Sequence, residues 1–396
     1  MESRQVFGKL LLLGFMLGFA AAGCQVLPDR GMSGPASEVV VSGFNVPPRL
    51  RYGATPCACI GAPFIGENLG KHGYYFRTAE KNGIAYTRRG GHIDTMHLRI
   101  AADWTAYLAA KSYRHLMRGD QSFSYKLLAD RSRHTVHISY PENWQSMPQE
   151  QRREAAREVA LTMGPYLAYS MVSWHEIITW YGFHSVGVIR ESHSAFSWED
   201  SYSNLLGAVV AARALRDTQR SYNEAVTIAL DEEMRELGVQ PAAVARQASE
   251  SVRGTWYTGV VGPLMSMRRR NPDIGVDDGL VTPVLALDLP AGAEPASYPA
   301  PTLETIAKYG FWAFVEIEPH EWERRKVLRI VYPNGKGKRV YPTAHFAPIM
   351  AHIQQEAAAK YGLDMVSNPA PSTTQSRLAQ SKPIPPKTRG KMVSHR

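Results

Sequence analysis

The segment from Pro165 to Tyr181 is apolar on almost all of its faces and carries only a His-Glu pair near its centre. A helix that is hydrophobic all round is stable only when other elements surround it. We therefore expect this segment to be a buried helix in the middle of one large folded body. The chain has 396 residues, of which 44% are hydrophobic, and this is enough to build a sizeable core around such a helix.

The patterns on either side of this segment predict an α+β fold, a mainly helical single large domain with small antiparallel hairpins. Helices are expected over residues 94–111, 148–162, 165–181, 197–216, 224–237, 241–252 and 344–361. Strands are expected over residues 84–87, 125–128, 135–140, 311–317, 327–332 and 339–341. The last two strands are expected to form a hairpin that turns at Asn334-Gly335, a strong two-residue turn signal. Residues 281–301 are Pro-rich and are expected to be irregular but packed.

The beginning of the chain has the pattern of a bacterial export signal. Arg4 and Lys9 precede an uncharged run over residues 10–23, which is too short to span a bilayer. The run ends in Ala-Ala-Gly-Cys, which resembles the lipobox of bacterial lipoproteins, where the cysteine is acylated, as by palmitate, and becomes the first residue. We predict that residues 1–23 are a lipoprotein signal peptide and that lipid on Cys24 binds the protein to a membrane. The alternative is an ordinary signal peptide with a chance cysteine.

The residue after the cysteine bears on the location of the protein. By resemblance to the sorting rule of enterobacterial lipoproteins, Gln25 rather than Asp points to the outer membrane. The expected location is therefore the cell envelope, with the folded part facing the periplasm.

Composition divides the remainder of the chain into three parts. Residues 24–50 are rich in Gly, Pro and Ser and are expected to be a flexible tether, residues 51–366 a globular α+β domain, and residues 367–396 a disordered basic tail. The net charge of +9 is uneven, because the tail carries six basic residues and no acidic one. A mildly basic body in an exported protein argues against nucleic acid as a partner, and an envelope polymer or another envelope protein is expected instead.

Two further cysteines, Cys57 and Cys59, form a Cys-Ala-Cys sequence. In an oxidising envelope, such a close pair is compatible with a strained disulfide or with two thiols. Two cysteines by themselves are too few for a zinc site.

Three segments concentrate polar residues in apolar surroundings, at residues 88–99, 174–180 and 194–204. In the second, His175 and Glu176 stand in the apolar helix, where ionisable groups need partners. A metal ion is one such partner, but the zinc-protease pattern His-Glu-x-x-His is incomplete, because Thr179 takes the place of the second His. The alternative is a hydrogen-bonded pair that fixes helix packing.

The first segment offers the ligands that the second lacks. Asp94 and His97 are three residues apart and share a face at the start of a helix. With His175 they are expected to form a nitrogen and oxygen site for one divalent ion, zinc before others. In the alternative interpretation Asp94 is the N-cap of the helix, His97 pairs with a neighbouring acid, and Arg89 or Arg99 balances the charge. His92 precedes them in a Gly-rich approach that brings the backbone close.

The third segment places Glu199 and Asp200 in the first turn of a helix, where the helix dipole favours anions. Asp200, Asn204 and Gly207 share a face with Ser203, and this polar stripe of small residues either lines a cleft or lets two helices approach closely. The full set of expected site residues is Glu176 as catalytic base, His97, His175 and Asp94 as metal ligands, and His92, Arg99, Glu199, Asp200 and Asn204 as further members of the polar cluster.

These three segments, together with Asp277-Asp278-Gly279-Leu280 and the His345-Phe346 helix, resemble an uncharacterised family of bacterial lipoproteins, the domain of unknown function 4056 family. The resemblance covers roughly residues 50–365. It implies one folded unit and implies nothing direct about mechanism.

Two functions follow from the sequence. The first is a metal-dependent hydrolase of the cell envelope, in which Glu176 activates a metal-bound water. The second is a non-catalytic binding or scaffolding lipoprotein with a structural His-Glu pair. No nucleophile elbow, phosphate-binding Gly loop or dinucleotide fingerprint is present, which disfavours serine hydrolases and nucleotide-dependent enzymes.

Overall fold

The computed structural model describes residues 34–43, 48, 64–73, 80–127, 131–182, 184–185, 189–190, 194–259, 266–286 and 293–366. The predictions for the export signal, Cys24, Cys57, Cys59 and the tail after residue 366 concern residues outside these ranges. In the described part the helices are α2 (Ala36–Ser42), α3 (Thr95–Arg118), α4 (Gln149–Trp180), α5 (Asp200–Ala214), α6 (Tyr222–Glu236), α7 (Ala242–Ser251), η1 (Glu304–Tyr309), α8 (Arg324–Val331), α9 (Pro342–Tyr361) and η2 (Leu363–Met365).

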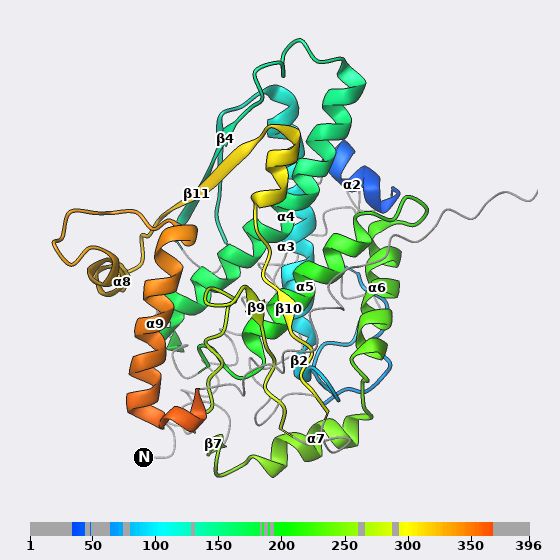
Figure 1. Cartoon of the computed structure of the whole chain (residues 1–396). Coiled ribbons are helices and arrows are strands. Elements are labelled where there is room, and N and C mark those ends of the chain that lie inside the picture. Colours follow the sequence, from blue (N-terminus) through cyan, green and yellow to red (C-terminus); the bar gives the residue numbers. More distant parts are fainter. Residues whose placement is uncertain are drawn as a thin grey trace, which may run out of the picture.

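Helices α3, α4 and α5 pack against one another at the centre of the molecule (Figure 1). Helix α4 is buried along most of its second half, and the side chain of Trp174 is completely enclosed. The expectation of a buried central helix over residues 165–181 is therefore confirmed, because other elements cover it on all sides.

Helix α4 is continuous through Pro165, so the prediction of separate helices over 148–162 and 165–181 is wrong. The preceding Gly164 lies so close to α3 that an added Cβ would be 2.7 Å from Cβ of Ala109. A proline removes one helical hydrogen bond, but the close packing of α4 against α3 stabilises the helix on both sides of it.

Helix α3 begins where the sequence predicts, because Asp94 is its N-cap. Oδ1 of Asp94 accepts hydrogen bonds from the backbone N–H groups of Met96 at 2.8 Å and His97 at 3.3 Å. The helix continues beyond the expected end at residue 111 and stops at Gly119, whose φ of +77° is in the left-handed region that glycine adopts without strain.

The largest sheet has three antiparallel strands in the order β11–β4–β3, formed by β11 (Trp312–Glu318), β4 (Arg133–Ser139) and β3 (Ser122–Tyr125). Val136 of β4 lies opposite Val315 on one side and Phe123 on the other, and all three are buried on the core face. The strands predicted over residues 125–128, 135–140 and 311–317 are confirmed as β3, β4 and β11, with their bounds shifted by a few residues.

The remaining strands form two-stranded pairs, β1–β2, β5–β6, β7–β8 and β9–β10. Their bounds are β1 (Ile84–Thr87), β2 (Gly91–Asp94), β5 (His184–Ser185), β6 (Ile189–Arg190), β7 (Tyr257–Thr258), β8 (Ser266–Met267), β9 (Leu280–Val281) and β10 (Tyr298–Pro299). The predicted α+β class, mainly helical with small antiparallel sheets, is confirmed.

The region predicted as a hairpin near the C-terminal end contains a helix instead of a strand. Residues 324–331 form α8, whose Val327 is buried and whose Leu328 and Val331 pack against the core. Val340, expected to be in the second hairpin strand, exchanges backbone hydrogen bonds of 2.7 and 2.9 Å with Ile317 of β11. The apolar residues of this segment fit one face of a helix as well as they fit a strand, and their packing beside α9 decided between the two.

The segment expected to be a tether contains α2. Val39 and Val40 of this helix are buried, and the helix packs against α3. A stretch rich in Gly, Pro and Ser therefore includes a short helix with two valines buried in the core.

Candidate functional site at the start of helices α3 and α5

The three polar segments of the sequence meet where α3 and α5 begin. The backbone N–H of Asp94, at the end of β2, donates to Oγ of Ser203 in α5 at 2.9 Å. An added Cβ on Gly207 would lie 2.1 Å from the carbonyl oxygen of Leu98, so the two helix backbones are almost in contact. For Ser203 and Gly207, the interpretation that the small residues permit a close helix approach is confirmed.

His97 is held by Asp94 at this junction. Nδ1 of His97 lies 2.9 Å from Oδ2 of Asp94, and Asp94 is fully buried. An ionised carboxylate can only accept, so this contact places a proton on Nδ1. The side chain of His97 is 21% exposed. Nε2 has no hydrogen-bond partner in the described part of the chain.

Two further carboxylates lie close to the His97 ring. Oδ1 of Asp200 is 3.8 Å from Nδ1 of His97 and is buried without a hydrogen bond among the described residues. Its other oxygen, Oδ2, accepts from the backbone N–H of Ser197 at 3.0 Å. Glu176 of α4 is near enough for its charge to act on both His97 and Asp200. We refer to Asp94, His97, Glu176 and Asp200 as the acid–histidine cluster.

The loop that precedes α5 is strained where it contacts Glu176. Phe196 has a φ of +52°, and it is the one non-glycine residue with positive φ in the described ranges. Its backbone N–H donates to Oε2 of Glu176 at 2.9 Å, and its carbonyl accepts from the backbone N–H of Asn271 at 2.9 Å. A left-handed aromatic residue is rare, and backbone strain of this kind gathers at functional sites.

The charges of the cluster shift the protonation of its members. Burial by itself would lower the pKa of His97, but Asp94, Asp200 and Glu176 together raise that pKa well above the usual 6.5. Burial, followed by repulsion from Glu176, raises the pKa of Asp200 well above its usual 3.8. The cluster therefore retains protons near neutral pH, with His97 as an imidazolium and a proton available to Asp200.

Sequence reasoning missed Arg270, a buried cation beside this cluster. Its guanidinium donates to the carbonyl of Ala195 at 2.5 Å and lies over the rings of Trp180 and Tyr361. Burial lowers the pKa of Arg270, and the negative charges of Asp200 and Glu176 partly oppose the shift. Nothing in the run of three arginines at 268–270 distinguishes this one, because its burial depends on the loop at 194–200.

His92 packs behind the cluster as a neutral side chain. Its Nδ1 accepts from the indole N–H of Trp198 at 3.1 Å, and its ring meets those of Tyr86 and Trp198 edge to face. Burial lowers the pKa of His92 to about 3, with a small opposing effect of the backbone at Ala245. His92 therefore supports the start of α5 and does not exchange protons near neutral pH.

Arg99 does not belong to this cluster. Its guanidinium reaches His72 at 3.1 Å, Glu80 at 3.3 Å and the carbonyl of Leu69 at 2.8 Å. His72 in turn contacts Asp103 at 2.9 Å. These residues form a second buried network that attaches the segment at 64–73 to α3.

The other expected site residues are placed as follows. Glu199 and Asn204 are buried at the start of α5, on either side of Asp200 in the sequence. His175 is half-buried on α4 next to Glu176.

Asp94, one of the three expected metal ligands, already has other partners. Both oxygens of Asp94 are engaged, one by the N-terminus of α3 and the other by His97. Within the described ranges, no group of three or more His, Cys, Asp or Glu side chains is arranged to hold a metal ion. The zinc site of Asp94, His97 and His175 stays a prediction without support from this geometry.

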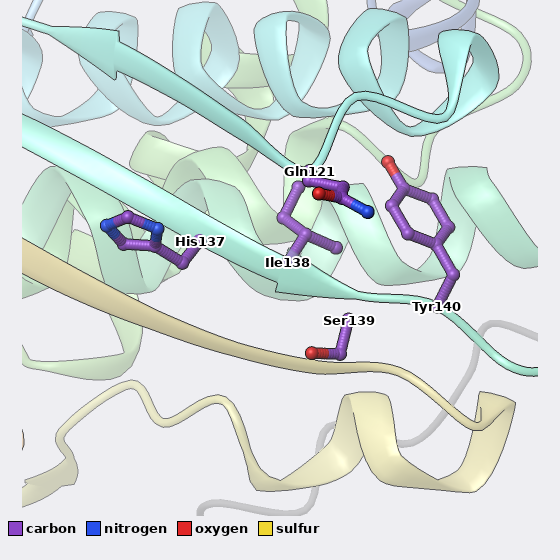
Figure 2. A pocket seen from close by; sticks show the side chains of 5 residues that line it. All are labelled: Gln121, His137, Ile138, Ser139 and Tyr140. Atoms are coloured by element: carbon purple, nitrogen blue, oxygen red, sulfur yellow. The ribbon is translucent and has the colours of Figure 1, made fainter.

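A surface hollow of about 530 Å³ lies away from the cluster, beside the end of β4 (Figure 2). It is lined by Gln121, His137, Ile138, Ser139 and Tyr140. The hydroxyl of Tyr140 donates to the carbonyl of Asp120, just beyond the last turn of α3. His97 is in the first turn of α3, and the rise of an α-helix separates the two ends by more than about 27 Å. This hollow is therefore not part of the acid–histidine cluster.

None of the helices in the described ranges is both long and apolar enough to cross a membrane. Neither the curated proteins nor the solved structures contain a match to the chain. The sequence model of one family, described as a protein of unknown function (DUF4056), matches residues 68–261. The match includes Asp94, His97, Glu176 and Asp200, all four members of the cluster. The chain belongs to the DUF4056 family.

Proposed function

We propose that this protein is a hydrolase of the cell envelope, held to the membrane by lipid on Cys24, with the acid–histidine cluster as its catalytic centre. The environment of His97 supports the proposal most strongly. Asp94 holds one ring nitrogen at 2.9 Å, the charges of two more buried carboxylates act on the ring, and the side chain keeps an exposed fraction of 21%. A fold gains no stability by gathering carboxylates that repel one another, so such a cluster favours a role in proton transfer.

In this proposal Glu176 is the general base and His97 the general acid. Water attacks the electrophilic carbon or phosphorus of the substrate, and Glu176 takes the proton that this water loses. His97 donates its Nε2 proton to the leaving oxygen or nitrogen, while Asp94 holds the imidazolium in place through Nδ1. Glu176 then returns its proton to His97 through solvent, which restores the starting state. Asp200 acts as a positioning residue, since its negative charge in the ionised form raises the pKa of His97.

The substrate class expected from the location is an envelope polymer, a peptide or a lipid. Zinc assistance also remains a proposal, and metal analysis of the purified protein tests it. A Cys24→Ser variant tests the anchor, because loss of lipid would move the protein from the membrane fraction to the soluble fraction. A wild-type protein found in the soluble fraction would contradict the anchor.

A second function is favoured by the burial of the cluster. Asp94, Glu176 and Asp200 are each less than a tenth exposed, as expected for a structural polar network. In that case the protein is a non-catalytic binding or scaffolding lipoprotein of the envelope, and the cluster fixes the packing of α3, α4 and α5.

An activity screen with matched variants separates the two functions. The wild type is assayed with p-nitrophenyl esters, a p-nitrophenyl glycoside, bis-p-nitrophenyl phosphate and purified cell-wall sacculi. His97→Ala and Glu176→Gln should each reduce the rate by about 100-fold or more, as expected for loss of a general acid or base.

His115→Ala is the control, because His115 contacts Asp120 at 2.7 Å and its side chain is 22% exposed. Like His97, His115 contacts one carboxylate, and the exposed fractions of the two side chains are nearly equal. His115 lacks the two further carboxylates, Asp200 and Glu176, that act on His97. Full activity of His97→Ala, or equal losses in His97→Ala and His115→Ala, would refute the catalytic role. An inactive wild type on every substrate would favour the scaffold.

A further inference from the structure

The segment from His320 to Arg339 forms a basic lobe at the edge of the molecule. It consists of helix α8, the turn before it and the loop after it, and Figure 1 shows α8 to one side of the central helices. The segment contains seven Lys and Arg residues against two Glu residues. One of these two acids, Glu321, is buried and accepts hydrogen bonds from Ser132, so it contributes little to the outer surface.

An exposed tryptophan lies in the turn just before α8. The side chain of Trp322 is 85% exposed, the largest exposed fraction among the large hydrophobic residues of the described ranges. A tryptophan fully in water has a cost that is removed when the ring enters an interface of mixed polarity. The indole is well suited to the headgroup region of a bilayer, where one part of the ring is apolar and the N–H remains hydrated.

Several of the cations that follow Trp322 in the sequence are exposed. Arg325 and Arg329 are exposed and lie one turn apart on α8, and both follow Trp322 at helical spacing. Lys336 and Lys338 are exposed in the loop that follows. Within the described part of the chain, none of these four cations has an ion-pair partner. Their positive charge is therefore available to an outside partner.

The apolar face of α8 is already covered by the protein itself. Val327 is buried, and Leu328, Ile330 and Val331 pack against the core. The helix therefore does not insert into a bilayer as an isolated amphipathic peptide would. The lobe presents a surface that carries one exposed aromatic side chain and several exposed cations.

We propose that this lobe binds the anionic surface of a phospholipid membrane, with Trp322 in the headgroup layer and Arg325, Arg329, Lys336 and Lys338 on lipid phosphates. Charge complementarity selects an anionic partner, and the projecting indole favours a lipid surface over a nucleic acid. This contact is separate from the proposed lipid on Cys24. It orients the body on the membrane, which the lipid alone does not do.

Vesicle co-sedimentation of the full chain tests the proposal. The protein carries Cys24→Ala so that no acyl chain contributes, and the vesicles contain phosphatidylcholine alone or with 30% phosphatidylglycerol. Binding is expected to the anionic vesicles and to weaken with salt. A cation near an anionic surface contributes about 1 kcal/mol, or about fivefold in affinity, so Arg325→Ala with Arg329→Ala should weaken binding by about 25-fold. Trp322→Ala should weaken it as well.

Matched variants distinguish this site from general charge attraction. Arg153→Ala with Arg235→Ala removes the same charge from α4 and α6, and Trp312→Ala removes a tryptophan that is 60% exposed on β11. Both controls should bind as the parent does, and circular dichroism confirms that each variant is folded. Equal losses in lobe and control variants would overturn the proposal. So would equal binding to both vesicles, no binding to either, or binding to a DNA duplex in preference to anionic vesicles.

Discussion

Replacing Asp94 separates two roles that one side chain combines. Asp94 caps α3 through Oδ1 and holds His97 through Oδ2. Asn keeps an oxygen for the cap but removes the charge, whereas Ala removes both. A lost N-cap costs about 1 kcal/mol, and a lost hydrogen bond to a charged partner costs about 2 kcal/mol. We expect Asp94→Asn to lower the free energy of unfolding by about 2 kcal/mol and Asp94→Ala by about 3 kcal/mol.

The same replacement should change how stability depends on pH. The pKa of His97 is raised in the folded protein, so the stabilisation from its protonation is complete below the unfolded value of about 6.5. It is lost as the pH rises through the raised folded pKa. The pKa of Asp200 is also raised in the folded protein, so this residue too makes the free energy of unfolding fall as the pH rises, beginning near its unfolded pKa of about 4. Wild-type stability should therefore fall above pH 6.5, and Asp94→Asn should flatten this fall because the pKa of His97 drops.

Urea unfolding followed by circular dichroism between pH 5 and 9 measures both effects, and the NMR titration of His97 reports the pKa directly. Asp120→Asn is the control, since Asp120 also contacts a histidine, at 2.7 Å, but is 39% exposed. Its loss should cost less than about 1 kcal/mol, as for other exposed pairs. Asp94→Asn with wild-type stability at pH 6 and an unchanged pH profile would refute the electrostatic reasoning.

Three further replacements test other parts of the structure, each by urea or thermal unfolding. Gly207→Ala should destabilise the fold by about 3 kcal/mol, because its Cβ would be 2.1 Å from the carbonyl of Leu98; a wild-type midpoint would mean that the two helices are farther apart. Asp200→Asn should raise the melting temperature at high pH, where Asp200 of the wild type loses its proton and its buried charge repels Glu176; a lower melting temperature there would show that the charge is stabilising. Glu321→Ala should cost about 3 kcal/mol, because it leaves the hydroxyl of Ser132 and the backbone N–H groups of Arg131 and Ser132 without their acceptor; a loss below about 1 kcal/mol would contradict this.

The sequence predicted local structure well where one signal dominated. The N-cap at Asp94, the buried helix at 165–181 and the hairpin of β3 and β4 each depend on neighbouring residues, so their patterns are visible without the fold. It failed at α8, where the same apolar residues fit two periodicities. It also failed at Pro165, where packing against α3 outweighs one missing hydrogen bond.

The candidate site was predicted only as three separate polar segments. Their meeting follows from the packing of α3, α4 and α5, which brings the charge of Glu176 near His97 and Asp200 while Arg99 contacts His72. The inclusion of Arg270 is likewise a tertiary effect, because its burial depends on the loop before α5.

The sequence by itself determined that this chain forms a mainly helical α+β body with ionisable residues in apolar surroundings. Helices and strands follow from local hydrogen bonding and hydrophobic periodicity, which depend on residues a few positions apart. The sequence alone therefore predicts them. Only the tertiary structure decided which carboxylates surround His97. Electrostatic coupling acts through space over a few ångströms, and it depends on helix approaches such as that at Gly207, which join residues far apart in the chain.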